Sequence, residues 1–390
     1  MRRLPNSALA LSTLLAAGLL SACTTPAEEP SATLDLPEEL FNYADPDFPD
    51  HFSVESEGWH AQQPLLNDDN TPDDNPTTDA GATLGRVLFY DVDLSQNHTV
   101  ACSTCHEPEN GFSDDEVLSP GFDGGETRRH SMGLTNARFY REGRFFWDQR
   151  ADTLEDQVLM PFQDSVEMGM TLDEVVARVN ERADYADLFD AAFGDSDVTS
   201  DRISRALAQF VRSMVSTTSP YDEGRAQVDA RFDPFPNFSD RENLGKALFV
   251  RRPPEGGMGC FVCHQGEGFI AVEATNNGLD ADSDDDGGYG EVTENSSDEG
   301  TFKVPSLRNV ALRAPYMHDG RFETLEEVID HYSDGVVSHP NMDPPLGPPG
   351  SGAPNTGMSD SEKAALVAFL ETLTDEEMVE DRKFSDPFVR

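Results

Sequence analysis

Two stretches of this sequence, Cys102-Ser103-Thr104-Cys105-His106 and Cys260-Phe261-Val262-Cys263-His264, decide its fold class. Both follow the pattern C-x-x-C-H, by which a c-type haem is attached through two thioether bonds while the histidine binds the iron. A zinc site would not need a histidine directly after each cysteine pair, and two local disulfides would leave both histidines unexplained. The sequence therefore predicts two covalently bound haems, with His106 and His264 as iron ligands.

These motifs contain four of the five cysteines, and the fifth, Cys23, follows a typical export signal. Arg2 and Arg3 give the chain a positive start, and the apolar run from Ala8 to Leu20 is short for a membrane-spanning helix. Leu20-Ser21-Ala22-Cys23 resembles a bacterial lipoprotein signal, in which the chain is cut before the cysteine and the cysteine is acylated. We expect residues 1–22 to be removed and Cys23 to anchor a periplasmic protein to a membrane, the outer membrane being favoured.

The charge of the chain narrows the classes of partner. It carries 74 acidic and 28 basic residues among 390, a net charge of −46. Such a surface repels phosphate backbones, so nucleic-acid binding is excluded. A solvated surface suited to a salty medium explains this acidity, and attraction of a basic redox partner is an alternative that can coexist with it.

The sequence around the two motifs repeats itself. Leu84-Gly85-Arg86-Val87-Leu88-Phe89 precedes the first motif and Leu244-Gly245-Lys246-Ala247-Leu248-Phe249 precedes the second, while Gly111-Phe112 and Gly268-Phe269 follow them. This duplication indicates two similar haem-bearing units. We expect an acidic, Pro- and Asp-rich tether over 23–80, a first haem domain over 81–235 and a second over 236–390.

The segments between these motifs have helical patterns. Thr171 with Glu174 and Thr324 with Glu327 have capping-box spacing, and apolar residues recur at helical spacing from Ser200 to Met214 and from Ser361 to Leu373. No run alternates as a strand would. We predict a mainly α fold of two cytochrome c-like helical domains, each around one haem. Asp282 to Gly287 resembles the start of an EF-hand, but Thr293 stands where such a loop needs Glu, so an acidic surface loop is favoured.

Further motifs resemble those of the bacterial di-haem cytochrome c peroxidases and the related MauG-type enzymes. Besides the haem motifs, the resemblance rests on five stretches between Phe145 and Gly320: Phe145-Phe146-Trp147-Asp148-Gln149-Arg150, Leu154-Glu155-Asp156-Gln157, Ser165-Val166-Glu167-Met168-Gly169, Val304-Pro305-Ser306-Leu307-Arg308-Asn309 and Ala314-Pro315-Tyr316-Met317-His318-Asp319-Gly320. It extends from about Leu84 to Leu373.

The resemblance implies roles for three residues. Glu167 corresponds to the carboxylate that moves a proton between the oxygens of peroxide at the first haem, and Gln157 to its polar partner. Trp147 corresponds to the residue between the haems on the electron route. From the residues alone, Glu167 would be a surface carboxylate and Trp147 a core residue.

The chain departs from the family pattern at the first haem. Typical members carry a distal histidine that must leave the iron on activation, but the stretch Phe122 to Thr127 contains none. His130 stands where the family has an asparagine that binds a calcium ion between the haems. We expect an open first haem, with His130 as an alternative ligand, and an inter-haem calcium is in doubt.

The chain also departs from the family pattern at the sixth ligand of the second haem. Typical peroxidases place a methionine fourteen residues after the histidine of the H-D-G motif, and this position is Tyr332. Helical spacing puts Tyr332 on one face with Leu325 and Ile329, and His331 off that face. Tyrosine is the ligand that MauG-type enzymes use, so we expect Tyr332 to be this ligand, with Met342 or Met358 as the alternative.

Taken together, these features favour a periplasmic di-haem peroxidase that reduces hydrogen peroxide to water with electrons from a small cytochrome c or a cupredoxin. One alternative is a MauG-like enzyme that oxidises side chains of a partner protein, and another is a plain electron-transfer cytochrome. A homodimer is compatible with the sequence, which does not reveal the oligomeric state.

Overall fold

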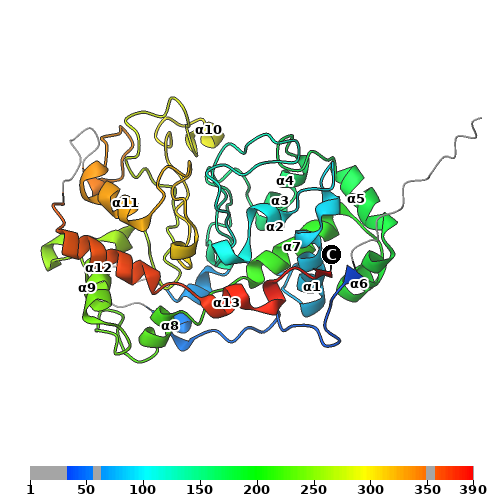
Figure 1. The fold of residues 1–390 in the computed structure, drawn as a ribbon, viewed down its shortest axis with the longest axis horizontal. Coiled ribbons are helices and arrows are strands. Elements are labelled where there is room, and N and C mark those ends of the chain that lie inside the picture. The colour runs from blue at the N-terminus through cyan, green and yellow to red at the C-terminus, as the bar shows by residue number, and fades with distance from the viewer. Residues whose placement is uncertain (1–32, 56–62, 348–355, 390) are drawn as a thin grey trace, which may run out of the picture.

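In a computed structural model, the described residues 33–55, 63–347 and 356–389 form two helical units that lie side by side. Figure 1 shows the first unit around α1 and α7, and the second around α9 and α12. Cys23 and the predicted export signal lie outside the described residues. Among those residues, no helix is long and apolar enough to cross a membrane.

The described chain is mainly helical, with one very small sheet. The α-helices are α1 Asp79–Tyr90, α2 Cys102–Cys105, α3 Leu154–Gln157, α4 Met160–Gln163, α5 Leu172–Glu181, α6 Ala183–Phe193, α7 Ser200–Ser213, α8 Pro220–Arg225, α9 Asp240–Val250, α10 Gly290–Thr293, α11 Leu325–Asp330, α12 Asp360–Glu371 and α13 Glu376–Glu380. The strands β1 Thr33–Leu34 and β2 Phe388–Val389 pair antiparallel, so the two ends of the described chain meet.

Helices α1 and α7 cross closely because a glycine stands at their contact. A Cβ atom on Gly85 of α1 would lie 2.0 Å from the carbonyl oxygen of Ala206 and 2.8 Å from the Cβ of Phe210, both on α7. Any larger residue would force the two helices apart. Ten residues of α1 are buried, among them Leu84, and most of the buried side chains pack into the first hydrophobic core.

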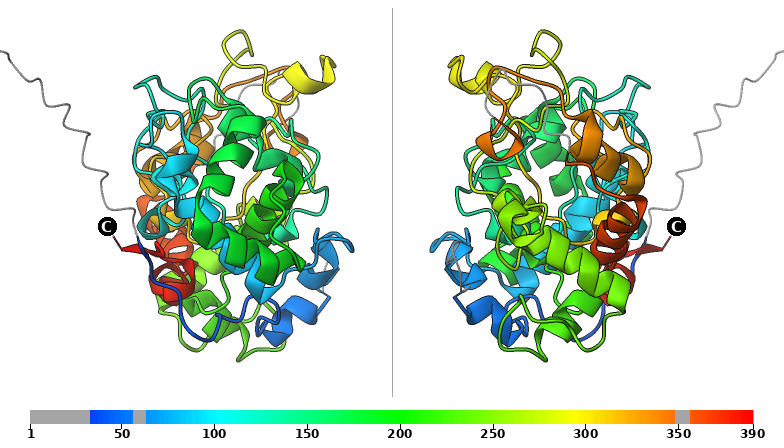
Figure 2. Two further views of the ribbon diagram at one scale, coloured as in Figure 1. Left: turned by 90° about the vertical axis from the view of Figure 1, so that its right-hand side faces the viewer. Right: turned by 90° about the vertical axis from the view of Figure 1, so that its left-hand side faces the viewer.

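The second unit uses the same contact. A Cβ atom on Gly245 of α9 would lie 1.8 Å from the carbonyl oxygen of Ala365 and 2.8 Å from the Cβ of Phe369, both on α12. Figure 2 views the helices of each unit from its own end of the molecule. The sequence repeat thus marks one helix-crossing motif used twice, and the predicted fold of two cytochrome c-like helical domains is confirmed.

The two hydrophobic cores do not divide strictly at residue 235. Tyr221 and Phe235 belong to the second core, whereas Met378 and Phe384, near the C-terminus, belong to the first. Figure 1 shows α13 running from the second unit back to the first. The C-terminal segment therefore ties the units together.

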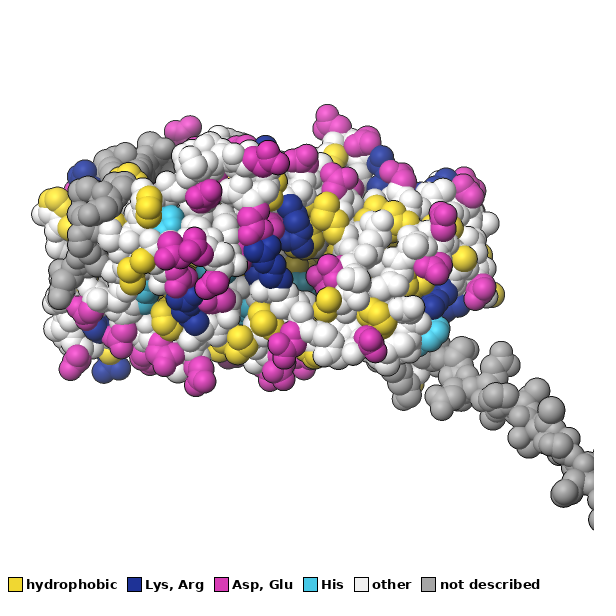
Figure 3. Space-filling model, turned by 90° about the horizontal axis from the view of Figure 1, so that it is seen from above, with side chains coloured by type: hydrophobic (Ala, Val, Ile, Leu, Met, Phe, Trp, Pro, Cys, Tyr) yellow, Lys and Arg dark blue, Asp and Glu magenta, His cyan; other side chains and the backbone are white. Residues whose placement is uncertain are grey.

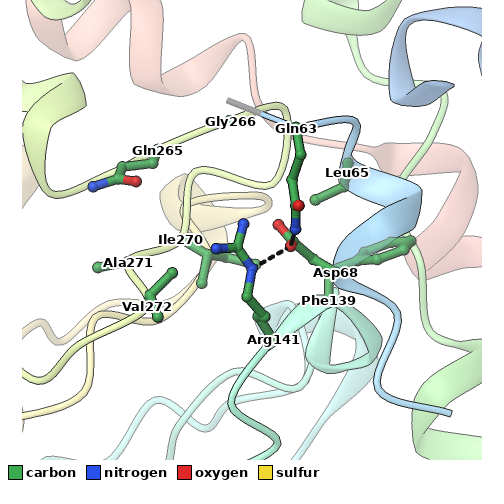
Figure 4. A pocket seen from close by; sticks show the side chains of 10 residues that line it. All are labelled: Gln63, Leu65, Asp68, Phe139, Arg141, Gln265, Gly266, Ile270, Ala271 and Val272. Atoms are coloured by element: carbon green, nitrogen blue, oxygen red, sulfur yellow. Dashed lines mark hydrogen bonds and ion pairs between the residues drawn. The ribbon is translucent and has the colours of Figure 1, made fainter. Parts of the chain in front are cut away.

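The lead-in segment also joins the two units. His51 Nε2 lies 2.9 Å from Oδ1 of Asp222 in α8, and Asp222 forms a bidentate ion pair with Arg308 at 2.6 and 2.9 Å. Further along, Asp68 accepts hydrogen bonds from Gln63 and Arg141 beside a cavity of about 30 Å³ that Ile270 of the second unit also lines (Figure 4). Residues 33–55 and 63–80 of the predicted tether therefore have a defined structure and contact both units.

Several predicted helix starts are confirmed. Thr171 and Glu174 form a capping box at α5, and α7 begins at Ser200 with the side chain of Thr199 as its cap. Thr324 caps α11 by accepting from the Glu327 N–H, but Glu327 in turn accepts from Glu323, so this pair is only half of the predicted box.

Candidate functional site

The first C-x-x-C-H motif is placed by α2 and the loop that follows it. Nδ1 of His106 lies 2.9 Å from the carbonyl oxygen of Phe112, to which it can donate, so Nε2 is the nitrogen that remains for an iron. Burial lowers the pKa of His106 to about 4, with the Phe112 carbonyl opposing the shift, so the imidazole is neutral, as a metal ligand must be. Phe112 and the preceding Gly111 have positive φ values, which turn this carbonyl toward the histidine.

The second motif is similar, except that Nδ1 of His264 is buried without a hydrogen-bond partner among the described residues. Burial lowers the pKa of His264 to about 4, and the Phe269 carbonyl opposes this shift as Phe112 does in the first unit. Phe269 again has a positive φ. None of the four cysteines of these motifs forms a disulfide in the described structure. Both motifs thus offer two free thiols and one neutral imidazole, the donor set that a covalent c haem needs.

Glu167 lies beside the first motif, in the turn after α4. Burial raises the pKa of the Cys102 and Cys105 thiols, and the charge of Glu167 is a smaller cause of the same sign for both. Burial and the neighbouring Asp164 raise the pKa of Glu167 itself to about 7, and Arg150 partly offsets the shift. A carboxyl with this pKa can both accept and return a proton at neutral pH.

The loop at Gly121 fixes the backbone on either side of Glu167. The N–H of Phe122 lies 3.2 Å from the carbonyl oxygens of both Val166 and Glu167, and a Cβ atom on Gly121 would lie 1.7 Å from the Val166 oxygen. Gln157, the last residue of α3, is partly buried. Its role as the polar partner of Glu167 stays a prediction.

His130 is held away from a distal position. Its Nδ1 lies 3.0 Å from the Glu116 carbonyl oxygen, its Nε2 lies 3.2 Å from Ser113 Oγ, and only 5% of the residue is exposed. The adjacent Ser131 Oγ lies 3.4 Å from His106 Nδ1, the side of His106 opposite to the iron-binding Nε2. His130 is therefore positioned behind His106, which favours the open first haem.

Trp147 lies where the two units meet. Its indole ring contacts His318 of the second unit, with ring centroids 6.4 Å apart, and its Nε1 donates to the His130 carbonyl oxygen at 2.8 Å. The N–H of His130 in turn donates to the carbonyl oxygen of His318 at 2.8 Å. This position fits the predicted role on a route between the haems.

His318 is a site residue for which the sequence reasoning gave no role. The short bridges Phe145–Ala151 and Tyr316–Phe322 show that Phe145–Arg150 and Tyr316–Arg321 are equivalent segments, so Trp147 and His318 are equivalent residues of the two units. Aligning these two segments would have revealed the relationship, but not that the two rings touch.

Tyr332 lies at the second haem motif. Burial raises its pKa to about 12, a hydrogen bond with the Asn277 side chain opposes the shift, and the Cys263 and Cys260 thiols add to it. Met342 is buried against Gly278, next to Asn277, whereas Met358 packs in the second core. The position of Tyr332 near both cysteines favours it as the ligand, with Met342 or Met358 as the alternative.

The prediction that His331 lies off the buried face of its helix is wrong. α11 ends at Asp330 and continues as a π-helical turn, His331–Gly335, which changes the direction of each following side chain. His331 is only 6% exposed, and its Nε2 lies 3.1 Å from the Asn277 carbonyl oxygen. The simple helical spacing used for the sequence cannot represent a π turn.

Comparisons with known proteins agree with this geometry. The sequence profile of the di-haem cytochrome c peroxidases matches residues 79–229. The chain is 36% identical over 309 residues to the methylamine utilization protein MauG of Methylorubrum extorquens, covering 77% of this chain and 80% of that protein. It is 30% identical over 301 residues to the cytochrome c551 peroxidase of Nitrosomonas europaea, covering 75% and 79%.

A solved structure is similar over nearly its whole length. The crystal structure of a MauG-like protein associated with microbial copper homeostasis is 33% identical, with a TM-score of 0.71, over 85% of this chain and 99% of that one. Two haem motifs, a repeated helical unit and these similarities lead to one conclusion: the chain belongs to the di-haem cytochrome c peroxidase and MauG family, whose members are c-type haem oxidoreductases.

Proposed function

We propose that this protein is a MauG-like di-haem oxidase, which uses hydrogen peroxide to remove electrons from a partner protein. The observation that carries the proposal is the position of Tyr332, which is half-buried and lies close enough to Cys260 and Cys263 for their thiols to raise its pKa. A tyrosine ligand favours oxidised iron, whereas a thioether raises the reduction potential and suits an electron-accepting haem. The higher identity to a MauG protein than to the named peroxidases supports this choice.

Cys102, Cys105 and His106 would hold the first haem, and Cys260, Cys263, His264 and Tyr332 the second. The bound haems supply O–O bond cleavage and one-electron chemistry. In the balanced reaction, one hydrogen peroxide takes up two protons and two electrons and gives two water molecules, and the partner protein supplies both electrons.

The residues of the chain handle the protons. Glu167 would accept a proton from hydrogen peroxide and return it to the departing oxygen, a role that needs a carboxyl with a pKa near neutrality. Gln157 orients the peroxide. The contact of Trp147 with His318 gives electrons a path from the second unit to the first.

The surroundings of the protein are part of the proposal. Export and acylation at Cys23 would place the enzyme in the periplasm, attached to a membrane. Asp and Glu are spread over the face shown in Figure 3 and outnumber Lys and Arg, some of which group near its middle. With the net charge of −46, a basic partner surface would be attracted to the protein. The copper-associated relative suggests a partner of metal homeostasis as one class to test.

A conventional peroxidase is the second candidate, because several relatives are named cytochrome c peroxidases and both Met342 and Met358 are buried in the second unit. The two are distinguished by mixing the oxidised holoprotein with one equivalent of hydrogen peroxide, with and without reduced small cytochrome c. The proposal predicts that peroxide reacts at once and that the oxidised protein persists without a donor. Rapid multiple turnover with cytochrome c, after obligatory prior reduction, would favour the conventional peroxidase.

A further inference from the structure

One guanidinium group joins the two haem units beside the aromatic pair. Arg129 Nη1 lies 2.6 Å from Oδ2 of Asp148, its neighbour in the first unit, and its Nε and Nη2 lie 2.8 and 2.7 Å from the carboxylate oxygens of Asp286 in the second unit. The side chains of Arg129 and Asp148 are each only 7% exposed. This ion pair is thus shielded from water, and charges attract each other more strongly when water is excluded.

The guanidinium also lies next to the stacked rings of the junction. The Cζ of Arg129 is 5.7 Å from the centroid of Phe302, and Phe302 stacks on His318 with centroids 3.8 Å apart and an angle of 13° between the rings. The ring of His318 also contacts Trp147, with centroids 6.4 Å apart. Arg129 therefore fixes both units at the point where their rings touch.

The family resemblance implies a calcium ion between the haems, but the residues of this junction do not supply the ligands for it. His130 replaces the asparagine ligand, and both of its ring nitrogens face Glu116 and Ser113 instead. Among the described residues, no cluster of three or more His, Cys, Asp or Glu side chains could hold a metal ion. Asp286, from the acidic stretch that resembles an EF-hand, binds Arg129.

We infer that the Arg129 guanidinium, bound by Asp148 and Asp286, takes the place of an inter-haem calcium ion and positions the contact between Trp147 and His318. Arg129 is a positioning residue, since it touches neither haem motif. The inference concerns the junction alone, and it holds whether the protein is an oxidase of a partner protein or a conventional peroxidase.

A cavity of about 380 Å³ adjoins the junction and contains other carboxylates. Asp280 lines this cavity, but it pairs with Arg321 at 2.8 Å, and Arg321 also pairs with Asp319. The acidic groups here are thus partly neutralised by arginine as well. Calcium binding in this cavity would also appear in a titration of the holoprotein, and it would contradict the inference.

The first test uses the wild-type holoprotein. We expect no binding heat on calorimetric titration with calcium chloride, and no change in melting temperature or haem spectra after treatment with EDTA. Stoichiometric calcium binding, or altered spectra of either haem after chelation, would overturn the inference.

The second test compares Arg129 with its neighbour. Arg128 binds Glu291 and approaches the same Asp286 at 3.4 Å, but its side chain is 54% exposed, so Arg128→Gln is a matched control. In stopped-flow mixing with peroxide, the spectral change of the second haem should be slowed roughly 100-fold in Arg129→Gln and unchanged in Arg128→Gln. Arg129→Lys keeps the charge but loses the two-pronged geometry, so it should give an intermediate rate. A rate within about twofold of wild type in Arg129→Gln would contradict the inference.

The third test uses the melting temperature of Arg129→Ala, which does not depend on enzymatic activity. Removing the guanidinium opens a position between Asp148, which keeps Arg150 as a partner, and Asp286, which keeps Arg128. Millimolar calcium or free guanidinium should therefore raise the melting temperature of this variant and not that of wild type. Equal responses of the two proteins would show that no cation position exists there. If Arg129→Ala does not fold, the wild-type titration and Arg129→Lys decide.

Discussion

At the scale of single residues, the chemistry depends on how burial changes the proton affinity of a few groups. Glu167 has a pKa of about 7 because burial and Asp164 outweigh Arg150, whereas the buried His106 stays neutral and able to bind iron. The sequence motif around Glu167 predicts its role, but its raised pKa depends on a turn and a loop that only the fold brings together.

We expect Glu167→Gln to load both haems normally and to consume peroxide about 10²–10⁴-fold more slowly, since the amide keeps the shape but cannot accept a proton. In wild type, a base with a pKa of about 7 is deprotonated above that pH, so the rate should rise as the pH rises through about 7. Stopped-flow rates across pH measure both effects.

Glu174, exposed in the capping box of α5, provides the control. Glu174→Gln should leave the rate and its pH dependence unchanged. A Glu167→Gln rate within about twofold of wild type would remove Glu167 from the mechanism.

At the scale of secondary structure, each haem unit depends on one helix crossing that the sequence repeat already marks. The repeat predicts that the helices around Gly85 and Gly245 are equivalent, and the structure adds that each glycine lets a second helix approach. By contrast, the π turn after α11 has no periodic signal, so the burial of His331 was not predictable from spacing.

Gly85→Ala should destabilise the first unit by about 1–3 kcal/mol, because its Cβ would lie 2.0 Å from the Ala206 oxygen on α7 and the helices must separate. Gly245→Ala should act in the same way on the second unit. Denaturant unfolding, followed by the absorption of each haem, would assign each loss to its own unit. Unchanged stability of both variants would mean that the crossings can widen freely.

At the scale of the whole molecule, contacts between distant segments hold the units together. The sequence predicts two units but not their connections, because Arg129 and Asp286, or Asp222 and Arg308, have no local signal that pairs them. The Asp222–Arg308 pair is almost fully buried, and although burial alone would raise the pKa of Asp222, Arg308 and His51 hold it well below the usual value.

Asp222→Ala should cost about 3–5 kcal/mol of unfolding free energy, since it leaves Arg308 buried without its counter-ion. The exposed pair Asp201–Arg205 is the comparison, and Asp201→Ala should cost no more than about 1 kcal/mol. Because the pKa of Asp222 is lowered in the folded state, its contribution is present at neutral pH and lost in acid. Equal losses for the two variants would contradict this account.

The central claim is that Tyr332 binds the second haem and makes this protein an oxidase of a partner rather than a conventional peroxidase. The most direct measurement is the ferric absorption spectrum of the Tyr332→Phe holoprotein, compared with Met342→Leu and Met358→Leu. We predict that Tyr332→Phe alone changes the second haem, raises its reduction potential and shortens the life of the peroxide-oxidised protein. An unchanged Tyr332→Phe spectrum, with a changed spectrum in either methionine variant, would contradict the claim.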